Sequence, residues 1–140
     1  MRIVSFQDDL IYQDPAPVCQ TFFVDPDIQS NFYLDAVITM VDCKHLLQHL
    51  DEEKPEGVEN EAVEQIAFAD RILLNKTDLV SANELVHLRA RIQSINAVAK
   101  MYECTYGKMN LDLILDVKGF DLSRILEMDA DFLKDQEHEV

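Results

Sequence analysis

Apolar residues along the chain form short continuous runs that alternate with segments of helical spacing. The continuous runs are rich in apolar and β-branched residues and have the length of buried strands; they cover residues 33–41, 71–74 and 99–105. Helical spacing is found in residues 44–50, 60–70 and 81–96. This alternation predicts an α/β fold built from parallel βαβ units, with helices on both faces of the sheet.

Capping signals mark the starts of two of these helices. Asn60 directly precedes one helical run, and Ser81 with Glu84 three positions later has the capping-box arrangement. The acidic segment 51–58, which contains a proline and a glycine, is expected to be a loop.

The two ends of the chain carry weaker patterns. Residues 2–6 are compatible with a short strand, and Asp14-Pro15 is typical of a helix start. That helix would end at Asp25-Pro26, because the residue before a proline disfavours the helical conformation. Near the other end, short helices are expected at residues 111–117 and 120–126. The polar tail 129–140 is expected to be mobile.

Charge and cysteine content exclude several classes of function. The formal net charge of -15 argues against nucleic acid and anionic membranes, because binding phosphate groups needs clustered lysine and arginine. No apolar run is long enough to span a bilayer, and 140 residues suit one small domain. The three cysteines include no CxxC pair, so reduced thiols and a cytoplasmic location are expected, with an organelle not excluded.

Polar residues that could carry chemistry follow the predicted strands. In parallel sheets, ligands gather at the carboxyl ends of the strands, which selects Asp42, residues 75–78 and residues 105–108. The second of these is Asn75-Lys76-Thr77-Asp78, between an apolar strand and a capped helix. A carboxylate at Asp78 can accept hydrogen bonds from the N1–H and the amine of guanine, a donor pair that adenine lacks.

The neighbours of Asp78 would assist in base recognition. Asn75 can tie adjacent loops together, and the methylene stem of Lys76 can lie over the base. The simpler alternative is that Asn75 and Asp78 only form a turn and cap the following helix.

A metal site is the other chemistry that the sequence raises. Cys43 and His45 are two positions apart, and His49 lies one helical turn after His45. No further ligand pair completes a tetrahedral zinc site, so a buried thiol and two surface histidines are the expected arrangement.

Several segments, taken together and in order, resemble the CobW-like GTPases. They are residues 14–18 (DPAPV), 20–23 (QTFF), 34–45 (LDAVITMVDCKH), 64–80 (EQIAFADRILLNKTDLV) and the Tyr106-Gly107 turn. The resemblance implies a P-loop NTPase-type parallel sheet of about three strands, and a GTPase that delivers zinc or cobalt to a client protein. It also implies that Asn75, Lys76 and Asp78 read guanine, with Thr105, Tyr106 and Gly107 bordering the base.

The chain also departs from that family. It has no GxxxxGK[ST] phosphate loop and no CxCC metal motif, and residues 1–13 have no counterpart in the family. We therefore expect residues 14–128 to form the C-terminal half of the GTPase domain, and residues 129–140 to be an acidic tail or the start of a linker. A splice form, a partial gene model and a degenerate copy would each give such a shortened product.

The departures set the functional expectations. GTP or GDP binding is expected to be weak or lost and catalysis absent, and magnesium and zinc are expected only for the complete family protein. Without a phosphate-loop strand beside it, strand 36–41 is expected to be an exposed edge, with marginal stability or oligomerisation as the result. The alternative function is a non-catalytic interaction module, or a degenerate fragment, that has lost nucleotide binding.

Overall fold

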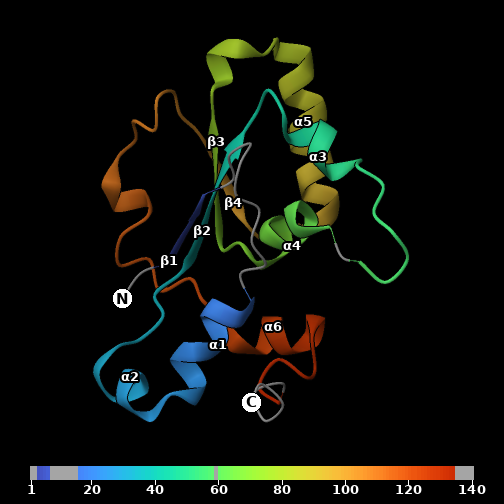
Figure 1. Ribbon diagram of the computed structural model, residues 1–140. Coiled ribbons are helices and arrows are strands. Elements are labelled where there is room, and N and C mark those ends of the chain that lie inside the picture. Colours follow the sequence, from blue (N-terminus) through green and yellow to red (C-terminus); the bar gives the residue numbers. More distant parts are fainter. Residues whose placement is uncertain (1–2, 7–15, 59, 135–140) are drawn as a thin grey trace.

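The computed structural model describes residues 3–6, 16–58 and 60–134 of the 140-residue chain, drawn in colour in Figure 1. Its strands are β1 (Ile3–Phe6), β2 (Val37–Asp42), β3 (Arg71–Asn75) and β4 (Lys100–Glu103). Its α-helices are α1 (Ala16–Val24), α2 (Pro26–Asn31), α3 (Leu46–Leu50), α4 (Glu61–Phe68), α5 (Ala82–Ile95) and α6 (Leu122–Met128). Two 3₁₀ helices, η1 (Thr77–Leu79) and η2 (Leu111–Leu113), complete the described elements.

The strands form one parallel sheet in the order β1-β2-β3-β4. An α/β parallel sheet is therefore confirmed, with a fourth strand at residues 3–6 beside the three that the apolar runs predicted. The expectation that strand 36–41 is an exposed edge is wrong, because β2 pairs with β1 on one side and with β3 on the other. Marginal stability or oligomerisation through an unpaired β2 is therefore not expected.

The α-helices that connect β2, β3 and β4 pack on one face of the sheet (Figure 1). Residues Val41, Ile72 and Leu74 of this face form a buried core with helices α3, α4 and α5. The prediction of helices on both faces is not met for these strands. The strands follow one another in sequence order, and crossovers of one handedness between neighbours place every connecting helix on the same side.

The opposite face is covered by irregular chain after β4. Here Ala36, Ile38 and Leu73 pack against partly buried residues of the 109–117 segment. The helix expected at residues 111–117 is reduced to η2. The reason lies just beyond it, where Asp116 and Lys118 have positive φ angles that a right-handed helix cannot contain.

A buried carboxylate fixes this covering segment to the start of β2. The side chain of Asp35 accepts hydrogen bonds from the backbone N–H groups of Val117 at 3.2 Å and Lys118 at 2.7 Å. Its backbone carbonyl accepts two more, from Gly119 and Phe120. Asp35 bonds to the covering segment instead of to a neighbouring strand. The strand β2 therefore begins at Val37 rather than at the expected residue 33.

Helix caps foreseen in the sequence are present. Asn60 accepts hydrogen bonds from the N–H groups of Ala62 and Val63, and Ser81 and Glu84 form the reciprocal capping box of α5. Asp25 has a second role that its place before Pro26 did not reveal: it caps α2, with the proline in the first turn. The helix start expected at Asp14-Pro15 lies outside the described residues.

The C-terminal end of α4 is held by two side chains from distant parts of the chain. The amide of Asn96 donates to the carbonyl oxygens of Ile66 and Ala69 at 2.9 and 2.8 Å. The guanidinium of Arg124 donates to the carbonyls of Ala67 and Phe68 and forms an ion pair of 3.2 Å with Asp70. These donors satisfy carbonyl groups that every helix leaves unpaired at its end.

A separate apolar cluster joins α1 and α6 below the sheet in Figure 1. Phe132 is fully buried in it, and its carbonyl accepts a 2.6 Å hydrogen bond from Gln20. The mobile tail expected from residue 129 onwards therefore does not describe residues 129–134, while residues 135–140 lie outside the described part. A search of the described residues finds no helix long and apolar enough to cross a membrane.

Arg124 gives a direct test of how α6 is fastened. Replacing it with alanine leaves the Asp70 carboxylate buried without its cation, and breaking such a pair costs about 3–5 kcal/mol. We expect Arg124→Ala to lower the free energy of unfolding by that amount in urea titrations followed by circular dichroism. Arg91→Ala is the matched control, because its ion pair with Asp51 is solvent-exposed and should be worth less than about 1 kcal/mol. Equal losses in the two variants would contradict the assignment.

Candidate functional site

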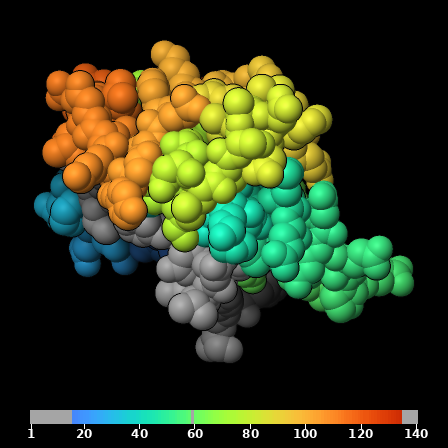
Figure 2. Space-filling view, turned by 90° about the horizontal axis from the view of Figure 1, so that it is seen from above, coloured from blue at the N-terminus to red at the C-terminus, as the bar shows by residue number. Residues whose placement is uncertain are grey.

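The segments that follow β2, β3 and β4 adjoin at the carboxyl edge of the sheet. In Figure 2 this edge is seen from above, with the chain after β3 in yellow-green between the teal chain after β2 and the orange chain after β4. The register explains the arrangement: Asp42 is paired with Asn75, and Leu74 with Glu103, so the strands end at nearly the same level.

Asn75 fastens the loop after β3 to the loop after β4. Its side-chain oxygen accepts a 3.0 Å hydrogen bond from the backbone N–H of Gly107 and a 3.6 Å bond from the thiol of Cys104. The hydroxyl of Thr77 adds a second link, because it donates to the carbonyl of Cys104 at 3.3 Å. The loop-tying role expected of Asn75 thus has a definite geometry.

Lys76 turns the chain out of β3 in an unusual conformation. Its φ and ψ angles are 60° and 33°, in the left-handed region that costs a non-glycine residue about 1–2 kcal/mol. Its ammonium group forms a 2.8 Å ion pair with the carboxylate of Asp42 across the end of β2. The loop is therefore shaped by a strained residue whose side chain is held by the neighbouring strand.

Asp42 is a buried carboxylate with several donors. Oδ1 accepts from the backbone N–H of Lys44 at 2.9 Å, and Oδ2 lies 3.0 Å from Nδ1 of His45 and 2.8 Å from Nζ of Lys76. Burial alone would raise the pKa of Asp42, but the hydrogen bonds from His45, Lys76 and Lys44, with the charge of Lys76, outweigh it and lower the pKa. Asp42 is thus charged at neutral pH.

Asp78 lies on η1, where its side chain is exposed to solvent. Among the residues that the structure describes, none forms a hydrogen bond or ion pair with its carboxylate. The cap of the next helix is supplied by Ser81 instead. Of the simpler alternative, the capping role of Asp78 is therefore wrong, while the turn is present as η1.

Thr105, Tyr106 and Gly107 form a tight turn at the end of β4. The turn is closed by a 3.0 Å hydrogen bond from the N–H of Lys108 to the carbonyl of Thr105. Tyr106 and Gly107 both have positive φ angles, 55° and 68°, and the Tyr106 side chain is 84% exposed. An exposed aromatic ring on a strained backbone costs stability, which is a pattern found at ligand-contacting turns.

The cysteine and the histidines considered as metal ligands have other environments. Burial, with a contribution from the charge of Asp42, raises the pKa of Cys43 to about 12, so this thiol stays protonated and is a poor ligand. His45 is engaged by Asp42. In the described ranges, no group of three or more histidine, cysteine, aspartate or glutamate side chains is arranged to hold a metal ion.

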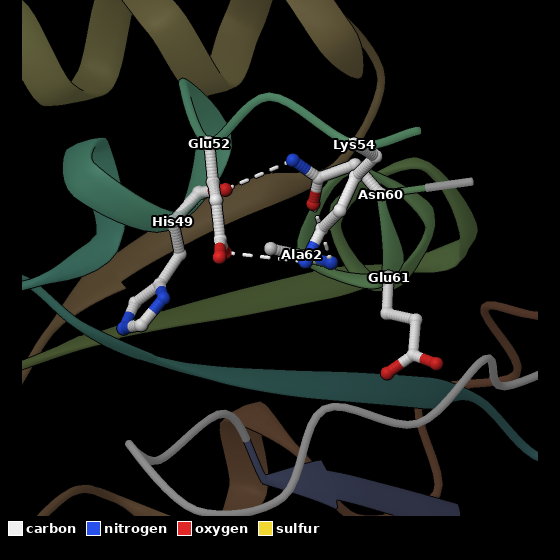
Figure 3. Close-up of a pocket in the computed structure, with 6 residues that line it drawn as sticks. All are labelled: His49, Glu52, Lys54, Asn60, Glu61 and Ala62. Carbon is white, nitrogen blue, oxygen red and sulfur yellow. Dashed lines mark hydrogen bonds and ion pairs between the residues drawn. The ribbon is translucent and has the colours of Figure 1, made fainter. Parts of the chain in front are cut away.

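His49 lines a small pocket between α3 and α4, with Glu52, Lys54, Asn60, Glu61 and Ala62 (Figure 3). Lys54 forms a 3.2 Å ion pair with Glu52, and Asn60 donates to the carbonyl of His49. The pocket's volume is about 80 Å³, whereas sites for small organic ligands usually have several hundred. It lies away from the carboxyl edge and is too small for a nucleotide.

The residues selected from the sequence thus meet at one edge of the sheet. Asn75, Lys76 and Asp78 are adjacent to Thr105, Tyr106 and Gly107 through the contacts of Asn75 and Thr77. Sequence reasoning gave no role to Asp42, which contacts Lys76, or to Cys104. The only signal for Asp42 was its place directly after an apolar strand, which it shares with Asn75.

Comparison with known proteins assigns the family. A model of the CobW/HypB/UreG nucleotide-binding domain matches residues 12–103. The zinc-regulated GTPase metalloprotein activator 1 of Schizosaccharomyces pombe is 38% identical over 117 residues, which are 84% of this chain and 25% of that protein. The zinc chaperone YjiA of Escherichia coli is 37% identical over 109 residues, covering 78% of this chain and 32% of the relative.

A solved structure agrees with these matches. The crystal structure of the Zn(II)-bound YjiA GTPase from Escherichia coli superimposes with a TM-score of 0.65 and 35% identity, over 79% of this chain and 32% of that one. The chain therefore spans about a quarter to a third of the length of these relatives. The matched region includes β2, β3 and the Asn75–Asp78 segment. The chain belongs to the CobW/HypB/UreG family and carries part of its nucleotide-binding domain.

Proposed function

We propose that the carboxyl edge of β3 and β4 binds the base of a guanine nucleotide, as the recognition part of a metal-delivering GTPase. The observation that carries the proposal is the outward-facing carboxylate of Asp78, which no described residue engages, beside a turn that Asn75 holds in place. A carboxylate so exposed can accept both donors on the guanine edge, N1–H and the exocyclic amine. Adenine offers no such pair, which supports guanine as the ligand.

The surrounding residues suit the flat base. We propose that the base lies between the alkyl stem of Lys76, two residues before Asp78, and the turn at residues 105–107, which contacts the loop after β3 through Thr77 and Asn75. Because the side chain of Asn75 accepts a 3.0 Å hydrogen bond from the N–H of Gly107, the turn is held against the loop after β3 before a ligand arrives. Such preorganisation reduces the ordering cost of binding.

The chain lacks the sequence motif that binds the phosphate groups of a nucleotide. Its sequence has no GxxxxGK[ST] loop, whose N–H groups and lysine hold phosphates and whose hydroxyl holds magnesium. We propose that GTP or GDP binds here through the base alone and therefore weakly, and that magnesium and zinc belong to the complete family protein. The described residues fit no zinc ion, so no step of this proposal passes through a metal.

Metal delivery enters the proposal through the relatives, whose names describe a zinc chaperone and a zinc-regulated metalloprotein activator. A client protein that receives zinc or cobalt is the corresponding partner. A cytoplasmic location suits the thiols of Cys43 and Cys104, which are buried and reduced. An oligomer formed through β2 is not part of the proposal, because both sides of that strand are paired.

Asp78 provides the test of base recognition. We expect the wild-type chain to bind GDP more tightly than ADP in NMR titrations, and Asp78→Ala to weaken GDP binding by about 10- to 100-fold through the loss of charge-assisted hydrogen bonds. Asp78→Asn should shift the preference to xanthosine diphosphate, whose C2 oxygen can accept from the new amide.

The matched control for this test is Asp112→Ala, an exposed aspartate on the other 3₁₀ helix, which should bind GDP as the wild type does. Equal affinity of the wild type for GDP and ADP would rule out guanine recognition. It would favour the other candidate, a module that keeps the fold for protein contacts alone.

Catalysis gives a separate prediction. Phosphoryl transfer depends on positioning and charge stabilisation by the phosphate loop and its magnesium. The purified 140-residue chain should therefore release no phosphate from GTP above the buffer background in a malachite-green assay with magnesium. Turnover at the rate of ordinary GTPases that Asp78→Ala removes would contradict the prediction. Turnover that is unchanged in Asp78→Ala but lost on repurification would point to a contaminating enzyme.

A further inference from the structure

Asp42 is the charged group next to the proposed base site that the function above leaves without a role. Its side chain is only 8% exposed at the end of β2, directly across from Asn75 in the strand register. A charge in such a position is costly unless it is well paired. Its donors divide between the two oxygen atoms: Lys44 N–H on Oδ1, and His45 and Lys76 on Oδ2.

The two oxygen atoms serve different parts of the chain. The bond to Oδ1 is local, two residues along the chain, and orders the turn between β2 and α3. The 2.8 Å contact of Oδ2 with Lys76 reaches across 34 residues to the loop after β3. A carboxylate that only ordered the start of α3 would not need this second contact.

Lys76 is the residue at which the loop departs from regular backbone. With φ at 60° it takes the left-handed conformation that lysine, unlike glycine, disfavours. The chain direction at this residue decides where η1 begins, and Asp78 is the second residue of η1. Whatever holds Lys76 in this conformation therefore also sets the position of the Asp78 carboxylate.

We propose that Asp42 is a positioning residue, whose buried carboxylate holds Lys76 in the left-handed conformation and so places Asp78 for guanine. The inference rests on the proposed function only for its last step. The effect of Asp42 on the backbone of Lys76 is a property of the loop and can be observed with no nucleotide present. The ammonium of Lys76 lies 2.8 Å from the Asp42 carboxylate at the end of β2.

The test uses Asp42→Asn, because this substitution separates the two contacts. The remaining carbonyl oxygen can still accept from Lys44 N–H, while the new amide group can no longer accept from the Lys76 ammonium. Backbone NMR of the full chain reports the conformation of Lys76 through its intraresidue amide-to-α-proton NOE and its Cα–Hα coupling. We expect the left-handed signature in the wild type and its loss in Asp42→Asn.

Two further variants complete the design. Lys76→Met removes the other partner of the same ion pair from a side chain that is 44% exposed, so it should fold and should also lose the left-handed signature at position 76. Asp70→Asn is the matched control: it neutralises another buried, ion-paired aspartate, just before β3, and should leave Lys76 unchanged. A left-handed backbone retained at position 76 in either Asp42→Asn or Lys76→Met would overturn the proposal.

Nucleotide binding supplies the functional readout. Asp42→Asn and Lys76→Met should each weaken GDP binding about tenfold, and the double variant should be no weaker than either alone, because both act through one contact. Additive losses would overturn the inference. If Asp78→Ala leaves GDP binding unchanged, the proposed function fails, and the NMR signature still decides whether Asp42 shapes the loop.

Discussion

The parallel register of β2, β3 and β4 is the constraint on which the candidate site depends. Hydrogen bonding pairs Asp42 with Asn75 and Leu74 with Glu103, so the strands stop at a common level and their polar loop residues emerge together. A slip of one residue would turn every side chain of a strand to the opposite face. In β3, Ile72 and Leu74 are buried on one face and Leu73 on the other, so such a slip would disturb the packing on both faces.

Buried polar side chains supply the long-range fastening that this sheet needs. Asp35 holds the chain that covers one face, Asn96 and Arg124 hold the end of α4, and Asp42 holds the loop after β3. In each case a charged or amide group meets backbone or ionic partners far along the chain, which compensates its loss of water. Strained residues accompany two of these anchors, Lys118 beside Asp35 and Lys76 beside Asp42.

Local patterns in the sequence were sufficient for the elements that local physics controls. In the Ser81–Glu84 capping box and the Asn60 cap, the bonded groups are at most four residues apart in the sequence. The apolar runs of β2 and β3 are buried, as continuous apolar runs predict whatever the strand order. The motif Asn75–Asp78 could be found for the same reason, since it follows such a run. These features need no knowledge of which strand is next to which.

Features that depend on the path of the chain could not be read in this way. The pairing of residues 3–6 with β2 needs the strand order, and so does the absence of connecting α-helices from the face that Ile38 and Leu73 occupy. In the sequence, Asp42 is like any polar residue at the end of a strand. Its 2.8 Å ion pair with Lys76 depends on the pairing of β2 with β3. Asp116 and Lys118 have positive φ angles that end the helix expected there. Because neither residue is a glycine, this conformation has no signal in the sequence.

The cluster around Phe132 joins helices that are far apart in the sequence and are therefore synthesised at different times. It takes α1 from one end and α6 from the other, and the Gln20–Phe132 hydrogen bond spans 112 positions. During synthesis on the ribosome, α1 would emerge long before α6 and Phe132. Leu34, Val37 and Phe68 of the same cluster emerge in between, but the apolar face of α1 is fully covered only once translation has passed residue 132.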